Sequence, residues 1–342
     1  MRFLKGNAES AVSSATPTFV DDAPAHLVGA IQAHGGGVSS LVVTPDSTRF
    51  VSGGHDQMAR VWDLASGQLL GTFSGHHDNV RALALAPDGS HVASTGDWSS
   101  GNWSVRIWDL STTREERMLK ELTHKRVSPA VFGVHSLVVT PVNPRLIAGG
   151  MGRLLIWDWD SGRLARDVGE FWKPEDFARS LALTRDGDLM VSAGGDNTVP
   201  VWDLKNVQVV CRLEGNTKKV RAAAVTPDGT RIVSAGEDSK VRVWSRGKQT
   251  RWNLASGLVE HTLVGHTGEV NKVAITPDGT RVVSGGKDGT VRVWDLATGS
   301  LEFTLAGQSN ISNNEVTALA VTPDGSKIIS GNKDGNVRVW SL

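Results

Sequence analysis

The stretch GHTGEVNKVAITPDGTRVVSGGKDGTVRVWDL, residues 265–296, sets the pattern for most of the 342-residue chain. Its apolar residues alternate or cluster without a helical period, and Pro-Asp-Gly at 277–279 predicts a tight turn between two short strands. The closing VRVWDL recurs along the chain with small changes. Seven tryptophans mark these units, with separations of 46, 49, 45, 42, 50 and 46 residues: Trp62, Trp108, Trp157, Trp202, Trp244, Trp294 and Trp340.

Self-similarity at this spacing indicates a repeat architecture in which each unit is one group of four short strands. The units resemble the Trp-Asp (WD) repeat β-propeller family, whose motif runs Gly-His, strand, Pro-Asp-Gly, second strand, then a third strand ending in Trp-Asp. The resemblance covers roughly residues 24–342 and is weakest in units three and four. It implies an all-β fold, a single seven-bladed β-propeller of four-stranded antiparallel blades.

The last unit lacks the outer strand that follows Trp-Asp in the other units. Residues 25–34, AHLVGAIQAH, read like that missing strand. Because an open ring would leave unpaired strand edges, we expect the N-terminal strand to complete the last blade and close the ring. Residues 1–20, rich in Ala, Ser and Thr, predict a disordered N-terminal tail.

Composition narrows the function classes. Lys+Arg and Asp+Glu both number 36, so no global field attracts nucleic acid or an anionic membrane. No apolar run approaches the roughly eighteen residues of a membrane span. The single cysteine, Cys211, excludes an intramolecular disulfide framework and suits a reducing compartment. We therefore expect a cytoplasmic protein with no cofactor or metal, and neither nucleic acid nor membrane as partner.

Two units contain Ser, His and Asp in a pattern that invites a hydrolase interpretation. The same steps of 18, 4 and 6 residues relate His34, Ser52, Asp56 and Trp62 in unit one and His266, Ser284, Asp288 and Trp294 in unit six. A catalytic triad is needed once and is recognised by its geometry, so repetition favours a structural role. The family resemblance implies that each set is a hydrogen-bonded tetrad inside one blade, and we expect no catalytic residues.

Candidate binding residues lie where the repeat is enlarged. Unit two has 14 residues from Ser94 to Trp108 instead of the usual 10, and units three and four have longer connections before their inner strands. In a propeller of this topology these insertions share one face, the top, where loops commonly bind partners. The predicted partner-binding residues are Trp98, Trp103, Lys125, Arg126, Phe132, Phe171, Trp172, Lys173, His55, Arg81, Glu237 and Lys287.

One alternative stays open for this face. The aromatic residues could instead fold inward and cover the irregular units three and four. The other top-face positions carry mixed charge, with Arg81, Arg221 and Lys272 opening inner strands and His55, Glu237, Lys287 and Lys333 preceding the tight-turn Asp. This mixture is mildly basic and favours acidic or phosphorylated ligands only weakly.

A second candidate site lies on a loop that the resemblance assigns to the opposite, bottom face. Residues 244–257, WSRGKQTRWNLASG, contain about eight residues beyond the repeat. The candidate residues for binding an acidic partner there are Arg246, Lys248, Arg251 and Trp252. The alternative is a solvated loop, which is the commoner fate of such charge runs.

The sequence thus predicts a non-enzymatic scaffold or adaptor that binds a protein or peptide in trans through its top face. We expect a monomeric propeller within a larger complex. One alternative is a small-molecule-binding or enzymatic propeller that uses the mouth of the central channel, with His55, His124, His135 and Glu237 as candidates. Another is a structural subunit of an oligomer.

Overall fold

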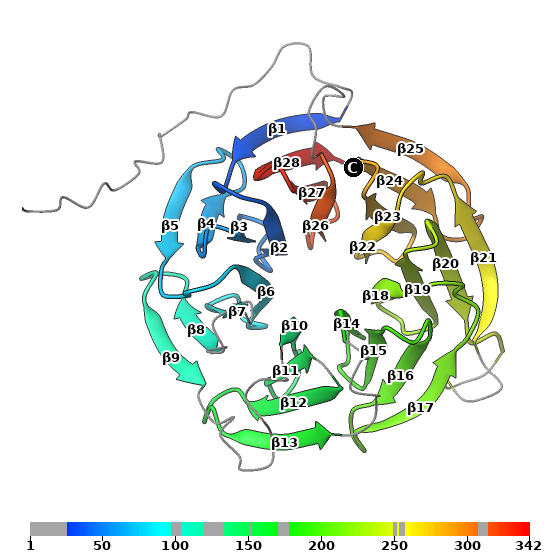
Figure 1. Ribbon diagram of the computed structural model, residues 1–342, viewed down its shortest axis with the longest axis horizontal. Coiled ribbons are helices and arrows are strands. Elements are labelled where there is room, and N and C mark those ends of the chain that lie inside the picture. The colour runs from blue at the N-terminus through cyan, green and yellow to red at the C-terminus, as the bar shows by residue number, and fades with distance from the viewer. Residues whose placement is uncertain are drawn as a thin grey trace, which may run out of the picture.

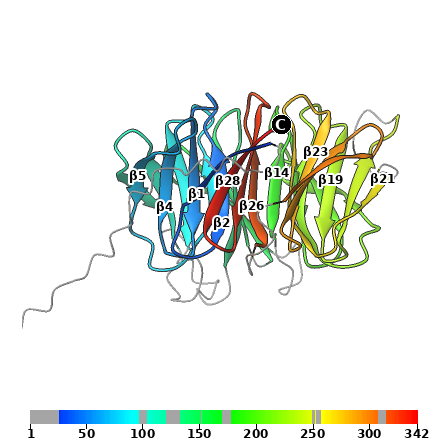
Figure 2. The same ribbon diagram turned by 90° about the horizontal axis from the view of Figure 1, so that it is seen from above.

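A computed structural model describes residues 26–96, 104–119, 133–150, 152–169, 178–248, 252, 257–306 and 314–342. In these segments, 28 strands form seven four-stranded antiparallel sheets that are arranged radially around a central axis (Figure 1). Seen from the side, the ring is a flat disc (Figure 2). The predicted all-β, seven-bladed propeller is confirmed. None of the described segments forms a helix long and apolar enough to cross a membrane.

Each blade runs from an inner strand at the channel to an outer strand at the rim. Blades one and two comprise β2 (Val38–Val43), β3 (Arg49–Gly54), β4 (Ala59–Asp63), β5 (Leu69–Phe73), β6 (Val80–Leu85), β7 (His91–Gly96), β8 (Val105–Asp109) and β9 (Glu115–Leu119). Blades three and four comprise β10 (Val134–Val139), β11 (Arg145–Gly150), β12 (Arg153–Asp158), β13 (Leu164–Gly169), β14 (Ser180–Leu183), β15 (Leu189–Ala193), β16 (Val199–Asp203) and β17 (Gln208–Leu213). Blades five and six comprise β18 (Val220–Val225), β19 (Arg231–Gly236), β20 (Lys240–Ser245), β21 (Leu258–Val264), β22 (Val270–Ile275), β23 (Arg281–Gly286), β24 (Thr290–Asp295) and β25 (Leu301–Ala306).

Blade seven joins both ends of the described chain. Its inner strands are β26 (Val316–Val321), β27 (Lys327–Asn332) and β28 (Asn336–Ser341), and its outer strand is β1 (Leu27–Gln32). β1 pairs antiparallel with β28, with Leu27 opposite Trp340. The expected closure of the ring by the N-terminal strand is therefore confirmed. Residues 1–20, predicted as a tail, lie outside the described residues.

A glycine makes this closure sterically possible. Gly335, in the turn before β28, has a φ of +85°, a conformation that disfavours side chains. A Cβ atom there would lie 2.3 Å from the carbonyl oxygen of His34. The backbone carbonyl of Gly335 accepts hydrogen bonds from the N–H groups of Ala33 and His34 at 3.0 and 3.1 Å. The turn thus fixes the segment that follows β1 against the last blade.

The hydrophobic core consists of slabs between neighbouring blades. One slab, for example, packs Val283 and Val293 of blade six against Ile328 and Trp340 of blade seven. All seven repeat tryptophans are at most 4% exposed. Because the middle strands are covered on both faces, their apolar residues run together rather than alternating with polar ones. The slabs hold the blades rigidly, so side chains at the ends of the inner strands have fixed positions.

Candidate binding face

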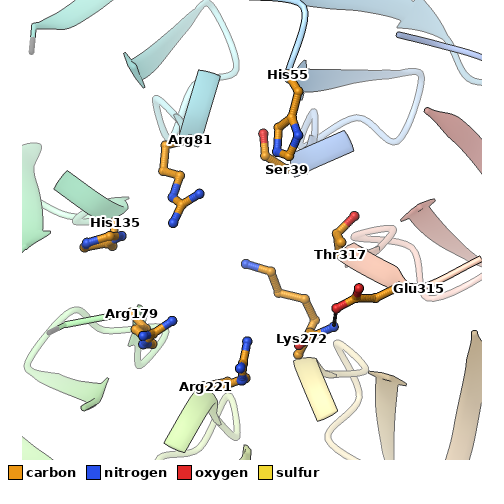
Figure 3. A pocket seen from close by; sticks show the side chains of 10 residues that line it. Ser39, His55, Arg81, His135, Arg179, Arg221, Lys272, Glu315 and Thr317 are labelled. Atoms are coloured by element: carbon orange, nitrogen blue, oxygen red, sulfur yellow. Dashed lines mark hydrogen bonds between the residues drawn. The ribbon is translucent and has the colours of Figure 1, made fainter. Parts of the chain in front are cut away.

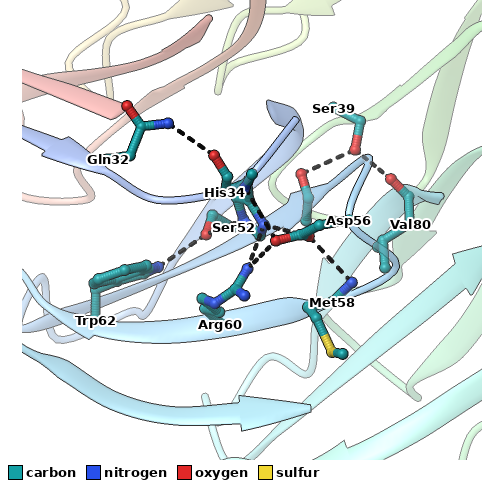
Figure 4. Close-up of polar contacts among 11 residues, drawn as sticks. Gln32, His34, Ser39, Ser52, Asp56, Met58, Arg60, Trp62 and Val80 are labelled. Atoms are coloured by element: carbon teal, nitrogen blue, oxygen red, sulfur yellow. Dashed lines mark hydrogen bonds and ion pairs between the residues drawn. The ribbon is translucent and has the colours of Figure 1, made fainter. Parts of the chain in front are cut away.

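Blade one ties its strands together through five side chains (Figure 4). His34 Nε2 lies 2.8 Å from Ser52 Oγ, and His34 Nδ1 lies 2.8 Å from Asp56 Oδ1. The Trp62 indole N–H donates to Ser52 Oγ at 2.8 Å, and Arg60 donates to Asp56 at 2.6 Å. Ser52 is 0% exposed. Because these polar groups are satisfied internally and the hydroxyl is out of reach of a substrate, the geometry is structural rather than catalytic.

The same arrangement occurs in blade six. His266 Nε2 lies 2.8 Å from Ser284 Oγ, and Nδ1 lies 2.9 Å from Asp288 Oδ2. Trp294 donates to Ser284 Oγ at 2.9 Å. Burial raises the pKa of Asp288, but hydrogen bonding and charge attraction from His266 and backbone N–H groups outweigh it. The pKa of this carboxyl therefore lies well below its ordinary value.

Blades three and four depart from this arrangement to different degrees. Blade four keeps the central bond, because Trp202 donates to Ser192 Oγ at 3.0 Å. In blade three, Ala148 occupies the serine position, and among the described residues the buried Trp157 indole N–H has no hydrogen-bond partner. Blade four is therefore more regular than its sequence suggests, and blade three is the weakest repeat.

Blade two buries a histidine in a different electrostatic setting. His76 Nε2 lies 2.7 Å from Ser94 Oγ, which also accepts the Trp108 indole N–H at 2.7 Å. Burial, assisted by the nearby charge of Arg106, lowers the pKa of His76 to about 4. His76 is therefore neutral in the folded protein at neutral pH.

The turns between the second and third strands of the blades are fixed against the segments that lead into the inner strands. The backbone N–H of His55 donates to Gly37 at 2.9 Å, and that of Glu237 donates to Lys219 at 3.0 Å. In blade six the N–H of Lys287 donates to Glu269 at 2.7 Å. These turns and the starts of the inner strands consequently share one end of the ring, which we call the top face.

The top face opens into the central channel, and we call this opening the channel mouth. It forms a cavity of about 220 Å³ (Figure 3). One residue per blade, the one that follows the first buried residue of the inner-strand segment, reaches it. All seven such residues line the cavity: Ser39, Arg81, His135, Arg179, Arg221, Asn271 and Thr317. His55, Lys272 and Glu315 complete the lining. The mouth is therefore polar and carries more cationic than anionic side chains.

Acidic side chains neutralise part of this charge. Arg221 forms ion pairs with Glu237 at 3.1 Å and with Glu269 at 2.8 Å. Glu315 accepts a hydrogen bond from Asn271 at 3.0 Å. These contacts link blades five, six and seven around the mouth, and they hold the Arg221 guanidinium between two carboxylates.

The mouth does not have the geometry expected of an acid–base site. His55 and His135 come from blades one and three, and Figure 3 shows Arg81 between them. Glu237 is engaged by Arg221. His124, the remaining candidate for this alternative, lies outside the described residues. In the portion of the chain that the structure describes, no three His, Cys, Asp or Glu side chains are grouped so as to hold a metal ion.

The structure places four of the predicted top-face residues. His55 and Arg81 line the mouth, Glu237 pairs with Arg221, and Lys287 is exposed beside the mouth's rim. The remaining predicted residues of this face lie outside the described residues, namely Trp98, Trp103, Lys125, Arg126, Phe132, Phe171, Trp172 and Lys173.

On the predicted second site, Trp252 requires a correction. Its side chain is 4% exposed, packs against the core slab between blades four and five, and donates its indole N–H to the Gly229 carbonyl at 2.9 Å. An indole buried in this way cannot contact a partner. Lys248 is exposed, Arg246 is half-buried, and Arg251 lies outside the described residues.

Sequence reasoning passed over two of the mouth's charged residues, Arg179 and Glu315. The signal for Arg179 was present, because it follows Ala178, which occupies the position of the buried valine that opens the other inner strands. The alanine obscured the alignment of blade four with the other repeats.

The fold and its recurring Ser-Trp hydrogen bonds define a seven-bladed propeller of the WD type. The chain belongs to the family described as WD domain, G-beta repeat. The family model matches residues 25–63, 67–109, 172–203, 207–245, 257–295 and 299–341. The segment between the second and third matches contains blade three, the blade that has lost the serine.

Relatives by sequence are distant. The chain is 26% identical over 201 residues to eukaryotic translation initiation factor 3 subunit I of Nematostella vectensis, covering 58% of this chain and 60% of that protein. It is 28% identical over 180 residues to small ribosomal subunit protein RACK1y of rice, covering 51% and 50%. It is 25% identical over 240 residues to autophagy-related protein 16 of Arabidopsis thaliana, covering 59% and 46%. The chain thus spans about half to three fifths of these relatives.

Proposed function

We propose that this protein is a non-enzymatic scaffold whose top face binds a protein or peptide supplied in trans. The observation that carries the proposal is the ring of charged and polar side chains at the channel mouth. Every blade contributes one of them from a rigid strand end. These side chains do not belong to the tetrads that hold the blades together, and positions of this kind on a rigid scaffold commonly carry recognition.

Two of the matched relatives support a role inside an assembly. By name, one is a subunit of a translation initiation factor and another is a protein of the small ribosomal subunit. Only part of each relative is matched, so the proposal for this chain is limited to the coarser role of holding a protein partner. A cytoplasmic location belongs to the same proposal, because a reducing compartment suits a chain whose single cysteine, Cys211, is buried and in no disulfide.

The partner-binding surface extends, in this proposal, from the mouth to the enlarged turn that contains Trp98 and Trp103. A turn rich in Ser, Gly and Asn has little apolar cover of its own, and tryptophan is enriched in binding hot spots. These two indoles are not needed to complete the repeat, and we assign them to partner contact.

A quantitative pull-down from extract of the source organism tests the proposal. The baits are the unmodified protein, the Trp98→Ala/Trp103→Ala variant, and a matched bottom-loop control, Arg246→Ala/Lys248→Ala. We expect the top-face variant to lose at least one partner by about tenfold or more, the loss expected on removing one hot-spot residue. The control variant should retain that partner.

Two results would contradict the assignment. If the Trp98→Ala/Trp103→Ala variant retains every partner at the level of the unmodified protein, partner binding does not use this surface. If only the bottom-loop control loses partners, the binding face is the opposite one. Light scattering of the purified protein separates this proposal from self-assembly, because we expect a monomer.

A further inference from the structure

Lys272 stands out at the channel mouth because its position is occupied by small residues elsewhere. It is the second residue after the buried valine that opens β22. The equivalent residues in the other blades are Ser40, Ala82, Ser136, Ser180, Ala222 and Ala318. A four-carbon side chain thus replaces a small one in a single blade. In Figure 3 the Lys272 ammonium points toward the middle of the opening.

The surroundings of this ammonium are cationic. Arg81 and Arg179 reach the same cavity. Glu237 and Glu269 are bound to Arg221, and Glu315 is bound to Asn271. The side chain of Lys272 makes no hydrogen bond or ion pair with any residue that the structure describes. Lys272 is half-buried by its exposed fraction, and its ammonium carries three donors that an anion entering the mouth could meet.

The pKa of Lys272 shows that its surroundings disfavour the charged form, which a bound anion would stabilise. Burial, together with repulsion by Arg81, lowers the pKa of Lys272 to about 8. The charged and titratable groups that face it across the mouth are His55, Arg81, His135, Arg179, Arg221 and Glu315. Among these groups, Arg81 is the charge whose repulsion disfavours the ammonium.

The size of the cavity limits what could meet this requirement. At about 220 Å³ it holds roughly seven waters at about 30 Å³ each, which is less than the 300–1,000 Å³ typical of sites for drug-sized ligands. One compact group fits within this volume. Arginine forks and a lysine ammonium are the usual partners of phosphate and carboxylate oxygens.

We propose that the channel mouth is a binding site for one compact oxyanion of the phosphate or sulfate type, with the Lys272 ammonium as its central ligand and Arg81 and Arg179 beside it. The site goes beyond the scaffold role, because a free anion can occupy the mouth whether or not a protein covers the top face. The same group can also arrive on a phosphorylated peptide.

Sulfate is the probe for the first experiment, because its charge is constant between pH 6 and 10. Sulfate replaces chloride at constant ionic strength while the melting temperature of the full chain is followed. The comparison includes Lys272→Met, Lys272→Arg and a control on the exposed rim, Lys287→Met. Sulfate stabilises many proteins non-specifically, so the informative quantity is the difference between variants.

We expect a saturable rise in the unmodified protein and in the Lys287→Met control. Lys272→Met should weaken apparent sulfate affinity by about tenfold or more, the effect of losing one charge-assisted hydrogen bond, whereas Lys272→Arg should retain most of it. Above about pH 8 affinity should fall in the unmodified protein, as Lys272 loses its proton, but not in Lys272→Arg. Identical sulfate responses in the unmodified protein and in Lys272→Met overturn the proposal.

A second experiment identifies the source of the anion. Free phosphate is compared with a short peptide that contains one phosphoserine and with the same peptide containing serine. Tighter binding of the phosphopeptide than of free phosphate, lost in Lys272→Met, assigns the site to a chain-borne phosphate. Equal affinity for both, again lost in Lys272→Met, assigns it to a free anion. Binding of the serine peptide as tightly as the phosphopeptide overturns the oxyanion assignment.

Discussion

Replacing His76 with asparagine should remove part of the pH dependence of the protein's free energy of unfolding. His76 is buried, at 7% exposure, and its folded-state pKa is about 4 against an ordinary value of 6.5. Blade five has asparagine at this position by nature, and Asn216 Oδ1 accepts a hydrogen bond from Ser234 Oγ at 3.1 Å. His76→Asn is therefore a change that the blade architecture already accommodates.

The direction of the change in unfolding free energy with pH follows from the difference in proton binding between the folded and unfolded chains. Because the folded-state pKa lies below the unfolded one, the unfolded chain binds more protons between pH 6.5 and 4. The stability contributed by neutral His76 is fully present above pH 6.5 and is lost as the pH falls toward 4. From about pH 7.5 to about pH 5, the two pKa values give a loss of about 2 kcal/mol in the free energy of unfolding.

Equilibrium urea unfolding, followed by tryptophan fluorescence, measures this quantity at both pH values. The unmodified protein should lose about 2 kcal/mol more than His76→Asn on acidification, whatever the stability of the variant at pH 7.5. Above pH 7.5 the two proteins should show the same pH dependence, which provides the internal control. Parallel losses between pH 7.5 and 5 would refute the reasoning, because they would mean that His76 is protonated without cost.

Two further predictions concern the ring and its weakest blade. Deleting residues 1–32 removes β1 and should lower the free energy of unfolding by about 3 kcal/mol or more, since Leu27 and Ile31 lose their apolar contacts, whereas deleting residues 1–18 should lower it little. Equal melting temperatures for the two truncations would contradict the closure argument. Ala148→Ser should stabilise the protein by about 1 kcal/mol in urea unfolding, because its hydroxyl can accept the unpartnered Trp157 indole N–H; a destabilised variant would show that the space does not admit the hydroxyl.

The fold could be predicted almost completely because each repeat carries the same markers at the same positions. Tight turns such as that at Gly279 and buried tryptophans such as Trp294 recur at nearly constant spacing. One regular repeat therefore allows the less regular repeats to be aligned with it. Blade three was harder to identify because Ala148 removes the polar residue that marks the second strand. Packing of the Trp157 indole holds that blade even without its hydrogen bond.

The candidate site was less predictable because it depends on neighbours from different blades. Nothing in the sequence near Lys272 indicates that its ammonium faces Arg81, which lies almost 200 positions earlier. Trp252 was assigned to the surface because it stands in a charged loop, whereas the indole packs into the core slab between blades four and five and finds a carbonyl acceptor there. Local composition describes a loop's average exposure and not the direction of one large side chain.

The closure of blade seven also has a consequence for the order of folding. His26 and Ser341, which bond across the closing sheet, are 315 positions apart. Every strand pair of the other blades joins strands that follow each other in the sequence, but β1 has no partner until β28 exists. During synthesis β1 remains without a paired neighbour until the rest of the ring has been made. Sealing of the ring is therefore expected to be the last and slowest step, and the one most exposed to pairing with a second copy of the chain.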